Sequence, residues 1–237
     1  MEPGHSVLDV GCGPGTISAD LAARVAPGSV TGIDLSQEVI ELAIRNVAQD
    51  EAVNIAFLVD DVYDLHFDDG TFDVVYAHQV LQHLSEPVRA LREMRRVLAP
   101  GGVVALRDAD YGRFTWSPRD PRLVRWMELY HDITKRNGAE ADAGRHLVEW
   151  VDAAGFDRWS ASTSTWRFRS DEERAWWGGL WSDRVLQSEF ARQGLEFDLT
   201  TPAELDEISA AFLEWAADPE GEFVVVHDEV LARTTGE

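Results

Sequence analysis

The chain has 237 residues, enough for one large domain or about one and a half of average size, so it can bury an ordinary hydrophobic core. Apolar residues make up 45% and charged residues 27%, which is typical of a globular chain and excludes a disordered one. The 43 acidic and 21 basic residues give a net charge of −22, which repels phosphate backbones and anionic lipids. We therefore expect neither nucleic acid nor a membrane as a partner.

The sequence also lacks the signals of export or membrane insertion. No stretch approaches the roughly 18 apolar residues that a membrane span needs. Glu2 and Pro3 stand where a signal peptide would carry basic residues. Cys12 is the single cysteine and cannot form an internal disulfide, so a reducing cytoplasm is the expected location.

Through residue 110, short apolar segments alternate with helical periodicities. This alternation is typical of βαβ units that form a parallel sheet covered on both faces. The predicted strands are Ser6 to Val10, Ser29 to Asp34, Ile55 to Val59, Phe72 to Ala77 and Val103 to Asp108. The predicted helices are Ile17 to Val25, Gln37 to Ala48 and Pro87 to Leu98.

Beyond Tyr111 the pattern changes to long helical segments, and all nine Trp lie in this part. The predicted helices are Pro121 to Arg136, Gly144 to Ala154, Asp171 to Gln193 and Pro202 to Ala217. Trp159 to Phe168 and Phe223 to Leu231 are predicted as an antiparallel pair of strands that returns to the sheet edge. We therefore divide the chain into a core (1–110), a helical cap with an edge strand (111–222) and a final strand (223–237).

The most informative segment is 7–16 (VLDVGCGPGT), in which an apolar strand ends near an acid and a glycine-rich turn opens a helix. Glycines at such a turn let the backbone approach a ligand closely. The next predicted strand ends at Asp34, about 20 residues further on, where an acid is placed to bind the two hydroxyls of a ribose. These features together predict a nucleoside-containing cofactor.

The details of this loop distinguish between cofactors. Its spacing is G-x-G-x-G, whereas the dinucleotide fingerprint is G-x-G-x-x-G or A with amides directed at a pyrophosphate. Pro14 removes one amide donor, and Asp9 adds a negative charge beside the turn. That charge disfavours a pyrophosphate and favours a ligand with an ammonium and a sulfonium, so the predicted cofactor is S-adenosylmethionine.

Further blocks follow in register at 32–36 (GIDLS), 60–67 (DDVYDLHF), 72–77 (FDVVYA) and 91–102 (LREMRRVLAPGG). As an ordered set they resemble the class I S-adenosylmethionine-dependent methyltransferases, particularly the branch similar to ubiquinone and menaquinone methyltransferases. The resemblance covers roughly residues 1–110. It implies an α/β fold with a doubly wound, mostly parallel, seven-stranded Rossmann-like sheet and an inserted helical cap. The aromatic cap and the absence of a basic surface favour a small, partly apolar methyl acceptor.

By position, the resemblance assigns the glycine loop to cofactor binding. Gly11, Gly13 and Gly15 would lie against the methionine part of the cofactor, with Asp9 near its ammonium group. Cys12 belongs to the same loop and is interpreted as a small buried residue, not as a nucleophilic thiol.

The resemblance assigns the nucleoside to the ends of the second and third strands. Asp34 would bind the ribose hydroxyls, and Leu35 would pack on the adenine face. Asp61 would accept a hydrogen bond from the adenine amino group, with the Val62 amide beside it.

Candidate residues for the reaction follow the fourth and fifth strands. Ala77 and His78 would border the methionine carboxylate and the reactive methyl group. His78 and His83 are the candidates for a general base, with a hydrogen-bonded wall residue as the alternative for each. Asp108 and Tyr111 either orient the acceptor or form a polar strand end.

Trp176, Trp177 and Trp181 are close enough in a predicted helix to share a face. Core packing is the first interpretation of that face, and the lining of an apolar acceptor pocket is the second. His, Cys and carboxylate residues do not recur at zinc-like spacing, so no metal site is predicted.

Two other functions are compatible with the sequence. One is an NAD(P)-dependent oxidoreductase with a degenerate fingerprint, and the other is a methyltransferase-like binding protein that transfers nothing. Members of the resembled family usually carry a helical segment before the first strand that covers the cofactor, whereas here the strand begins about six residues from Met1. A truncated start is one explanation; otherwise the later helices, or a second subunit in a homodimer, would supply this cover.

Overall fold

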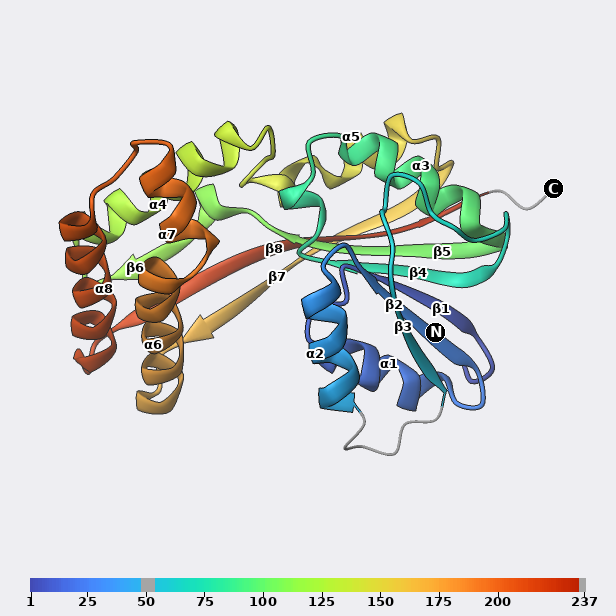
Figure 1. The fold of residues 1–237 in the computed structure, drawn as a ribbon, viewed down its shortest axis with the longest axis horizontal. Coiled ribbons are helices and arrows are strands. Elements are labelled where there is room, and N and C mark those ends of the chain that lie inside the picture. Colours follow the sequence, from blue (N-terminus) through green and yellow to red (C-terminus); the bar gives the residue numbers. More distant parts are fainter. Residues whose placement is uncertain (48–53, 235–237) are drawn as a thin grey trace.

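The protein is described by a computed structural model that covers residues 1–47 and 54–234. Its centre is a mixed sheet of eight strands in which β3, β2, β1, β4 and β5 are parallel neighbours (Figure 1). The strands are β1 (Ser6–Val10), β2 (Ser29–Asp34), β3 (Ile55–Val59), β4 (Phe72–His78), β5 (Leu98–Ala109), β6 (Thr115–Ser117), β7 (Arg158–Phe168) and β8 (Glu222–Arg233).

The predicted parallel sheet is confirmed, but it has one strand more than the seven predicted. The additional strand is β6, which pairs with the first residues of β8 in antiparallel register. Its three residues are too few to show the alternation of apolar and polar side chains by which a strand is recognised in a sequence. The predicted antiparallel pair is also confirmed, because β7 pairs with β8 from Arg158↔Arg233 to Phe168↔Phe223.

Helices cover both faces of the parallel strands, as expected for a doubly wound sheet (Figure 1). The helices are α1 (Thr16–Val25), α2 (Gln37–Val47), α3 (Pro87–Val97), α4 (Pro121–Arg136), α5 (Leu147–Ala153), α6 (Asp171–Gln187), α7 (Glu189–Glu196) and α8 (Pro202–Ala217). On one face α1 and α2 lie over β1 to β3, and on the other α3 and α5 lie over β4, β5 and β8. Leu91 and Met94 of α3 are fully buried in the second of these layers.

The helices α4, α6, α7 and α8 form a separate group beyond the carboxyl ends of the parallel strands, reached by the long strands β7 and β8 (Figure 1). An aromatic core holds this group together, with Trp126 fully buried 4.6 Å from Trp181 and 5.1 Å from Phe212, ring centre to ring centre. Trp177 belongs to the same core, whereas Trp176 is 57% exposed. Only part of the predicted tryptophan face is therefore buried.

The predicted helix from Asp171 to Gln193 is wrong in one respect, because it is interrupted at Ser188. This residue has an extended backbone, and its side chain accepts a hydrogen bond from the Phe190 amide, which caps a new helix, α7. The last residue of the predicted second helix, Ala48, and residues 235–237 of the final segment lie outside the described residues. Among the helices that are described, none is both long and apolar enough to cross a bilayer.

Candidate active site

The glycine loop connects β1 to α1 and adopts a backbone that other residues rarely reach. Gly11, Gly13 and Gly15 all have positive φ, from 54° to 82°. A Cβ at Gly11 would lie 2.6 Å from a methyl carbon of Val80, and one at Gly15 would lie 2.9 Å from the Phe57 ring. The loop therefore needs glycine both for its conformation and for its close packing.

Asp34 at the end of β2 connects this loop to the next helix. One carboxylate oxygen accepts a hydrogen bond from the Gly13 amide at 3.4 Å, and the other accepts one from the Ser36 amide at 3.1 Å. The carboxylate thus lies beside the glycine loop, at the carboxyl edge of the sheet, where ligands bind in open α/β folds.

A cavity of about 370 Å³ opens at this edge. Among the predicted cofactor residues, those that line it are Gly11, Asp34, Leu35, Asp61 and Val62. Leu35 is 73% exposed, so an apolar side chain is open to a ligand there.

The charge of this cavity distinguishes between cofactors. Its lining includes the carboxylates of Asp34, Asp60 and Asp61, and no Lys or Arg lines it among the described residues. Such a wall disfavours a diphosphate and favours a positively charged nucleoside. Asp61 accepts a hydrogen bond from the Tyr63 amide through Oδ1, which leaves Oδ2 free for a ligand.

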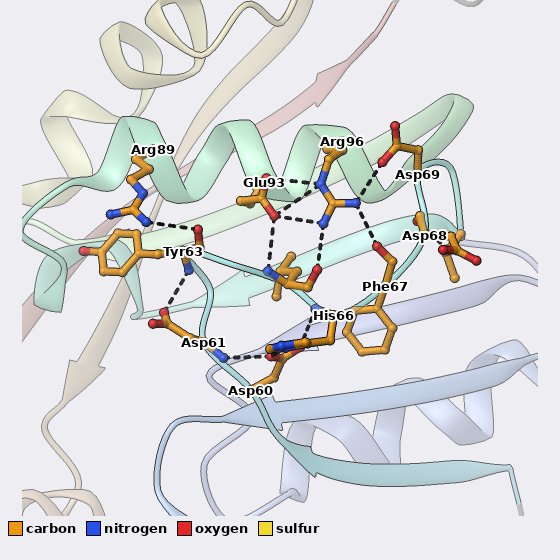
Figure 2. Close-up of polar contacts among 12 residues, drawn as sticks. Asp60, Asp61, Tyr63, His66, Phe67, Asp68, Asp69, Arg89, Glu93 and Arg96 are labelled. Carbon is orange, nitrogen blue, oxygen red and sulfur yellow. Dashed lines mark hydrogen bonds and ion pairs between the residues drawn. The ribbon is translucent and has the colours of Figure 1, made fainter.

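The segment that carries Asp61 and Val62 is braced against α3 (Figure 2). The Arg96 guanidinium donates to the backbone carbonyls of Leu65 and Phe67, each at 2.7 Å, and to the Asp69 carboxylate at 2.8 Å. Glu93 accepts hydrogen bonds from Arg96 and from the Leu65 amide. These contacts hold the Asp61 side of the cavity in place, although the loop contains no regular secondary structure.

Three of the predicted cofactor residues are buried behind the cavity and do not line it. Asp9 is 3% exposed and accepts a hydrogen bond from the Ser18 hydroxyl at 2.5 Å, and burial raises the pKa of its carboxyl to about 7. Cys12 is buried, and burial with the nearby Asp9 and Asp34 charges raises the pKa of its thiol to about 12, which keeps it neutral. Ala77 is fully buried in the sheet.

The remaining loop glycines, Gly13 and Gly15, also do not line the cavity. Together with Asp9 and Cys12 they shape the loop from behind, and Gly11 is the loop glycine that faces the cavity. Asp9 thus lies behind the loop, and its predicted place near the ammonium group of the cofactor stays a prediction.

A second cavity, of about 550 Å³, lies between the sheet edge and the helical group. It shares two lining residues, Gln79 and His83, with the first cavity. Tyr111, Tyr130 and Trp181 contribute aromatic side chains to its wall. The two cavities therefore adjoin, and a ligand in each would meet at the shared residues.

His83 stands on a short 3-10 turn, Leu81–His83, that follows β4. Burial and the charge of Arg184 lower the pKa of its imidazole, so the ring is neutral near pH 7. Its Nε2 lies 3.1 Å from the terminal amide of Gln82. With the oxygen of that amide accepting the Nε2 hydrogen, Nδ1 of the neutral ring is able to accept a proton from a ligand.

Asp108 holds this turn and does not itself line either cavity. It is completely buried at the end of β5, and its Oδ1 accepts the Gln82 amide hydrogen at 3.0 Å. Burial raises the pKa of its carboxyl to about 7, and its Oδ2 has no hydrogen-bond partner among the residues that the structure describes. Asp108 thus lies behind the turn that carries His83, and its predicted part in orienting an acceptor stays a prediction.

His78 lines neither cavity, and its predicted place beside the reactive methyl group stays a prediction. Because side chains alternate along a strand, its ring points to the sheet face opposite Ala77. There Arg107 donates to His78 Nε2 at 2.8 Å, and burial with the Arg107 charge lowers the pKa of His78 to about 4.

The same arginine fixes the orientation of Gln79. Arg107 Nη2 lies 3.0 Å from Nδ1 of His227, and since a guanidinium only donates, this nitrogen accepts. Burial with the Arg107 and His78 charges lowers the pKa of His227 to about 3, so its neutral ring carries the proton on Nε2. Nε2 lies 2.8 Å from the terminal amide of Gln79, which must accept this hydrogen through its oxygen. The amide NH₂ of Gln79 then remains as a donor at the wall between the cavities.

Tyr111 lines the second cavity, as its predicted contact with an acceptor requires. Its ring stacks on Tyr130, with ring centres 3.9 Å apart and planes 11° apart. Burial, the Tyr130 hydroxyl and a hydrogen bond to it raise the pKa of Tyr111 well above its usual value, so the phenol stays protonated. Tyr111 therefore acts as a neutral wall and not as a base.

Sequence reasoning missed several residues of this site. Gln79, Val80 and Gln82 directly follow β4, so the rule that ligands bind at carboxyl ends of strands could have identified them. Tyr130, Arg184 and Phe190 come from α4, α6 and α7, and no local signal connects them to the site. Within residues 1–47 and 54–234, no group of three or more His, Cys, Asp or Glu side chains is arranged to hold a metal ion.

The doubly wound sheet, the glycine loop and the acidic cavity define an α/β protein that binds a nucleoside. A family model described as a methyltransferase domain matches residues 7–102. An uncharacterized methyltransferase of Schizosaccharomyces pombe is 33% identical over 95% of this chain and 83% of its own length. Demethylmenaquinone methyltransferase of Lactococcus lactis is 38% identical over 54% of this chain and 48% of its own length.

Among solved structures, the fold is similar to that of phosphoethanolamine N-methyltransferase 2 from Haemonchus contortus, in complex with phosphomonomethylethanolamine and S-adenosylhomocysteine. The TM-score is 0.63 at 20% identity, over 99% of this chain and 49% of that one. The chain belongs to the S-adenosylmethionine-dependent methyltransferase family, with S-adenosylmethionine as its cofactor.

Proposed function

We propose that the protein methylates a small, partly apolar metabolite held in the 550 Å³ cavity. The observation that carries this proposal is the meeting of the two cavities at Gln79 and His83. A methyl donor in the acidic cavity and an acceptor in the aromatic one would face each other there, and alignment of two reactants is a large part of catalysis. The Lactococcus lactis relative is named for a quinone acceptor, which supports this substrate class.

The residues of the acidic cavity fit the cofactor. Asp34 would accept hydrogen bonds from the ribose hydroxyls, the exposed Leu35 would cover the adenine, and Asp61 Oδ2 would accept from its amino group. Val62 lies beside Asp61, and Gly11 leaves room at the glycine loop for the methionine part. When bound, S-adenosylmethionine supplies a methyl group on a positively charged sulfur, which needs no further activation.

The chain itself would position the acceptor and receive its proton. His83 is neutral and is placed to take the proton of an acceptor hydroxyl. The Gln79 NH₂, held by His227, would donate to the same acceptor oxygen and orient one of its lone pairs. Asp108 acts on the reaction indirectly, because it holds the turn that presents His83.

Two titrations and one transfer assay test this function. In calorimetric titrations we expect S-adenosylhomocysteine to bind with one site per chain and NADH to give no binding heat. Incubation with tritiated S-adenosylmethionine and a panel of phenols, quinols and aromatic acids should then label at least one compound. Binding of NADH but not of S-adenosylhomocysteine would overturn the proposal, and so would cofactor binding without transfer to any of the panel.

We further propose a cytoplasmic location and a homodimer. The free, buried Cys12 is consistent with a reducing compartment. Trp166 and Leu231 share one face of the outer strands and are 37% and 53% exposed, which supports cover by a second copy. Light scattering of the purified chain tests the dimer directly, and a monomeric mass at micromolar concentration would exclude it.

A further inference from the structure

The mouth of the 550 Å³ cavity carries an arginine that the protein does not neutralise. Arg184 of α6 lines this cavity and is exposed. Within the described residues its guanidinium forms no ion pair and donates no hydrogen bond, although it lies over the Trp181 ring, 5.5 Å from the ring centre. Its planar set of donors is therefore available to an anionic ligand.

Arg184 also determines the charge that a ligand in this cavity meets. The carboxylate in the lining, Glu189, is exposed and pairs with Arg192 at 2.6 Å, and Arg192 also pairs with Glu196. Burial is the larger cause of the lowered pKa of His83, and the charge of Arg184 is the second cause. The field of Arg184 therefore reaches the wall between the two cavities. Among the described residues that line this cavity, Arg184 is the one arginine or lysine, whereas no arginine or lysine lines the acidic cavity beside it.

The wall between the mouth and the inner end is aromatic and flat. Tyr130 stacks on Tyr111 and is nearly parallel to Phe190, with planes 21° apart and ring centres 6.3 Å apart. Trp181 adds a further ring beside Arg184. Such surfaces favour planar aromatic ligands over flexible aliphatic ones.

We propose that the methyl acceptor is a planar aromatic acid whose carboxylate binds Arg184 at the mouth of the cavity. Its hydroxyl group lies at the inner end, where Gln79 donates to it and His83 accepts its proton. This inference rests on the proposed function, because the cavity is an acceptor site only when the adjoining cavity holds the methyl donor.

The test compares 6-hydroxy-2-naphthoate, whose hydroxyl and carboxylate lie at opposite ends of the ring system, with the uncharged 6-hydroxy-2-naphthamide by calorimetry, on protein saturated with S-adenosylhomocysteine. We expect the acid to bind at least about tenfold more tightly than the amide, the difference typical of a charge-assisted hydrogen bond. In Arg184→Gln this preference should fall to about twofold or less, and Arg184→Lys, which keeps the charge but not the planar donors, should be intermediate.

Arg119 provides a matched control. It is also exposed and without an ion pair within the described residues, but it lines a different cavity. Arg119→Gln should keep the full preference for the acid. An equal affinity for acid and amide in the wild type, or a preference that survives Arg184→Gln, would overturn the inference. If S-adenosylhomocysteine still binds to the protein in such a case, the proposed function remains intact. If S-adenosylhomocysteine does not bind, the result counts against the proposed function.

Discussion

The two cavities that meet at Gln79 and His83 are built in different ways. The acidic cavity is lined mainly by residues that directly follow β1, β2, β3 and β4, so each lining segment continues a strand of the sheet. Most of the wall of the aromatic cavity comes from α4, α6 and α7, which reach it only through the packing of their shared core. The acidic cavity is therefore fixed by local sequence, whereas the aromatic cavity depends on tertiary structure.

The largest effect should come from the residue on the border of the two cavities. We expect His83→Ala to lower the rate of transfer to an acceptor hydroxyl by about 10²- to 10³-fold, because the general base is lost. The affinity for S-adenosylhomocysteine should change little. The measurement is a single-turnover tritium assay with an acceptor found in the panel, and an unchanged rate would reduce His83 to a wall residue.

A matched control for this variant is His131→Ala. His131 bonds to Asp142 at 2.9 Å and lines neither cavity. This variant should transfer at the wild-type rate.

Asp34→Ala should affect the cofactor side alone. Loss of hydrogen bonds to a charged acceptor costs about 1.5–3 kcal/mol, so we expect the Kd of S-adenosylhomocysteine to rise about 10- to 100-fold. Calorimetry measures this change, with Asp20→Ala on the exposed side of α1 as the control. A Kd within about twofold of the wild type would show that the ribose does not bind at the end of β2.

Gln79→Leu should have a smaller effect, confined to the transfer step. It removes the NH₂ donor at the border, and we expect transfer to slow by about tenfold, the cost of one neutral hydrogen bond. Gln193→Leu is the control, since Gln193 lines the aromatic cavity away from the border and bonds to Asn137. Equal rates for the two variants would contradict the orientation that we assign to the Gln79 amide.

The smallest effect concerns stability and pH. The pKa of Asp108 is raised to about 7 in the folded protein, so the folded state binds more protons than the unfolded state between about pH 4 and 7. Stability contributed by this group is therefore present at low pH and decreases as the pH rises towards 7. In the wild type, ionisation of Asp108 should lower the free energy of unfolding by about 1 kcal/mol between pH 6 and 8. In Asp108→Asn this part of the decrease should be absent.

Urea unfolding at the two pH values measures this difference. Asp9, whose pKa burial raises to about 7 as well, should behave in the same way in Asp9→Asn. Asp20→Asn, at an exposed position, should leave the pH dependence as it is in the wild type. An unchanged pH dependence in Asp108→Asn would show that this carboxyl is ionised at pH 6.

Much of the fold could be predicted from the sequence, because apolar periodicity and turn residues act locally. The five parallel strands follow from their apolar runs, and Gly11 and Asp34 follow from the loop spacing. The break at Ser188 could not be predicted, since it depends on a side chain that caps α7. Arg184 was missed because only the packing of α6 against the aromatic core brings it to the cavity mouth.

The prediction for Asp9 shows a limit of the same kind. An acid beside a glycine loop has the correct charge to attract a cationic nucleoside, but its direction depends on the alternation of side chains along β1. Asp9 bonds to Ser18, while the acidic wall of the cavity consists of Asp34, Asp60 and Asp61. The type of ligand was predicted correctly, although the structure places this charge on other residues.

The most direct test of the account is a crystal structure of the protein with S-adenosylhomocysteine and 6-hydroxy-2-naphthoate. We expect the ribose at Asp34, the sulfur at the border formed by Gln79 and His83, and the naphthoate ring in the aromatic cavity with its carboxylate on Arg184. A nucleoside outside the acidic cavity, or a sulfur turned away from His83, would contradict the claim that donor and acceptor meet where the two cavities join.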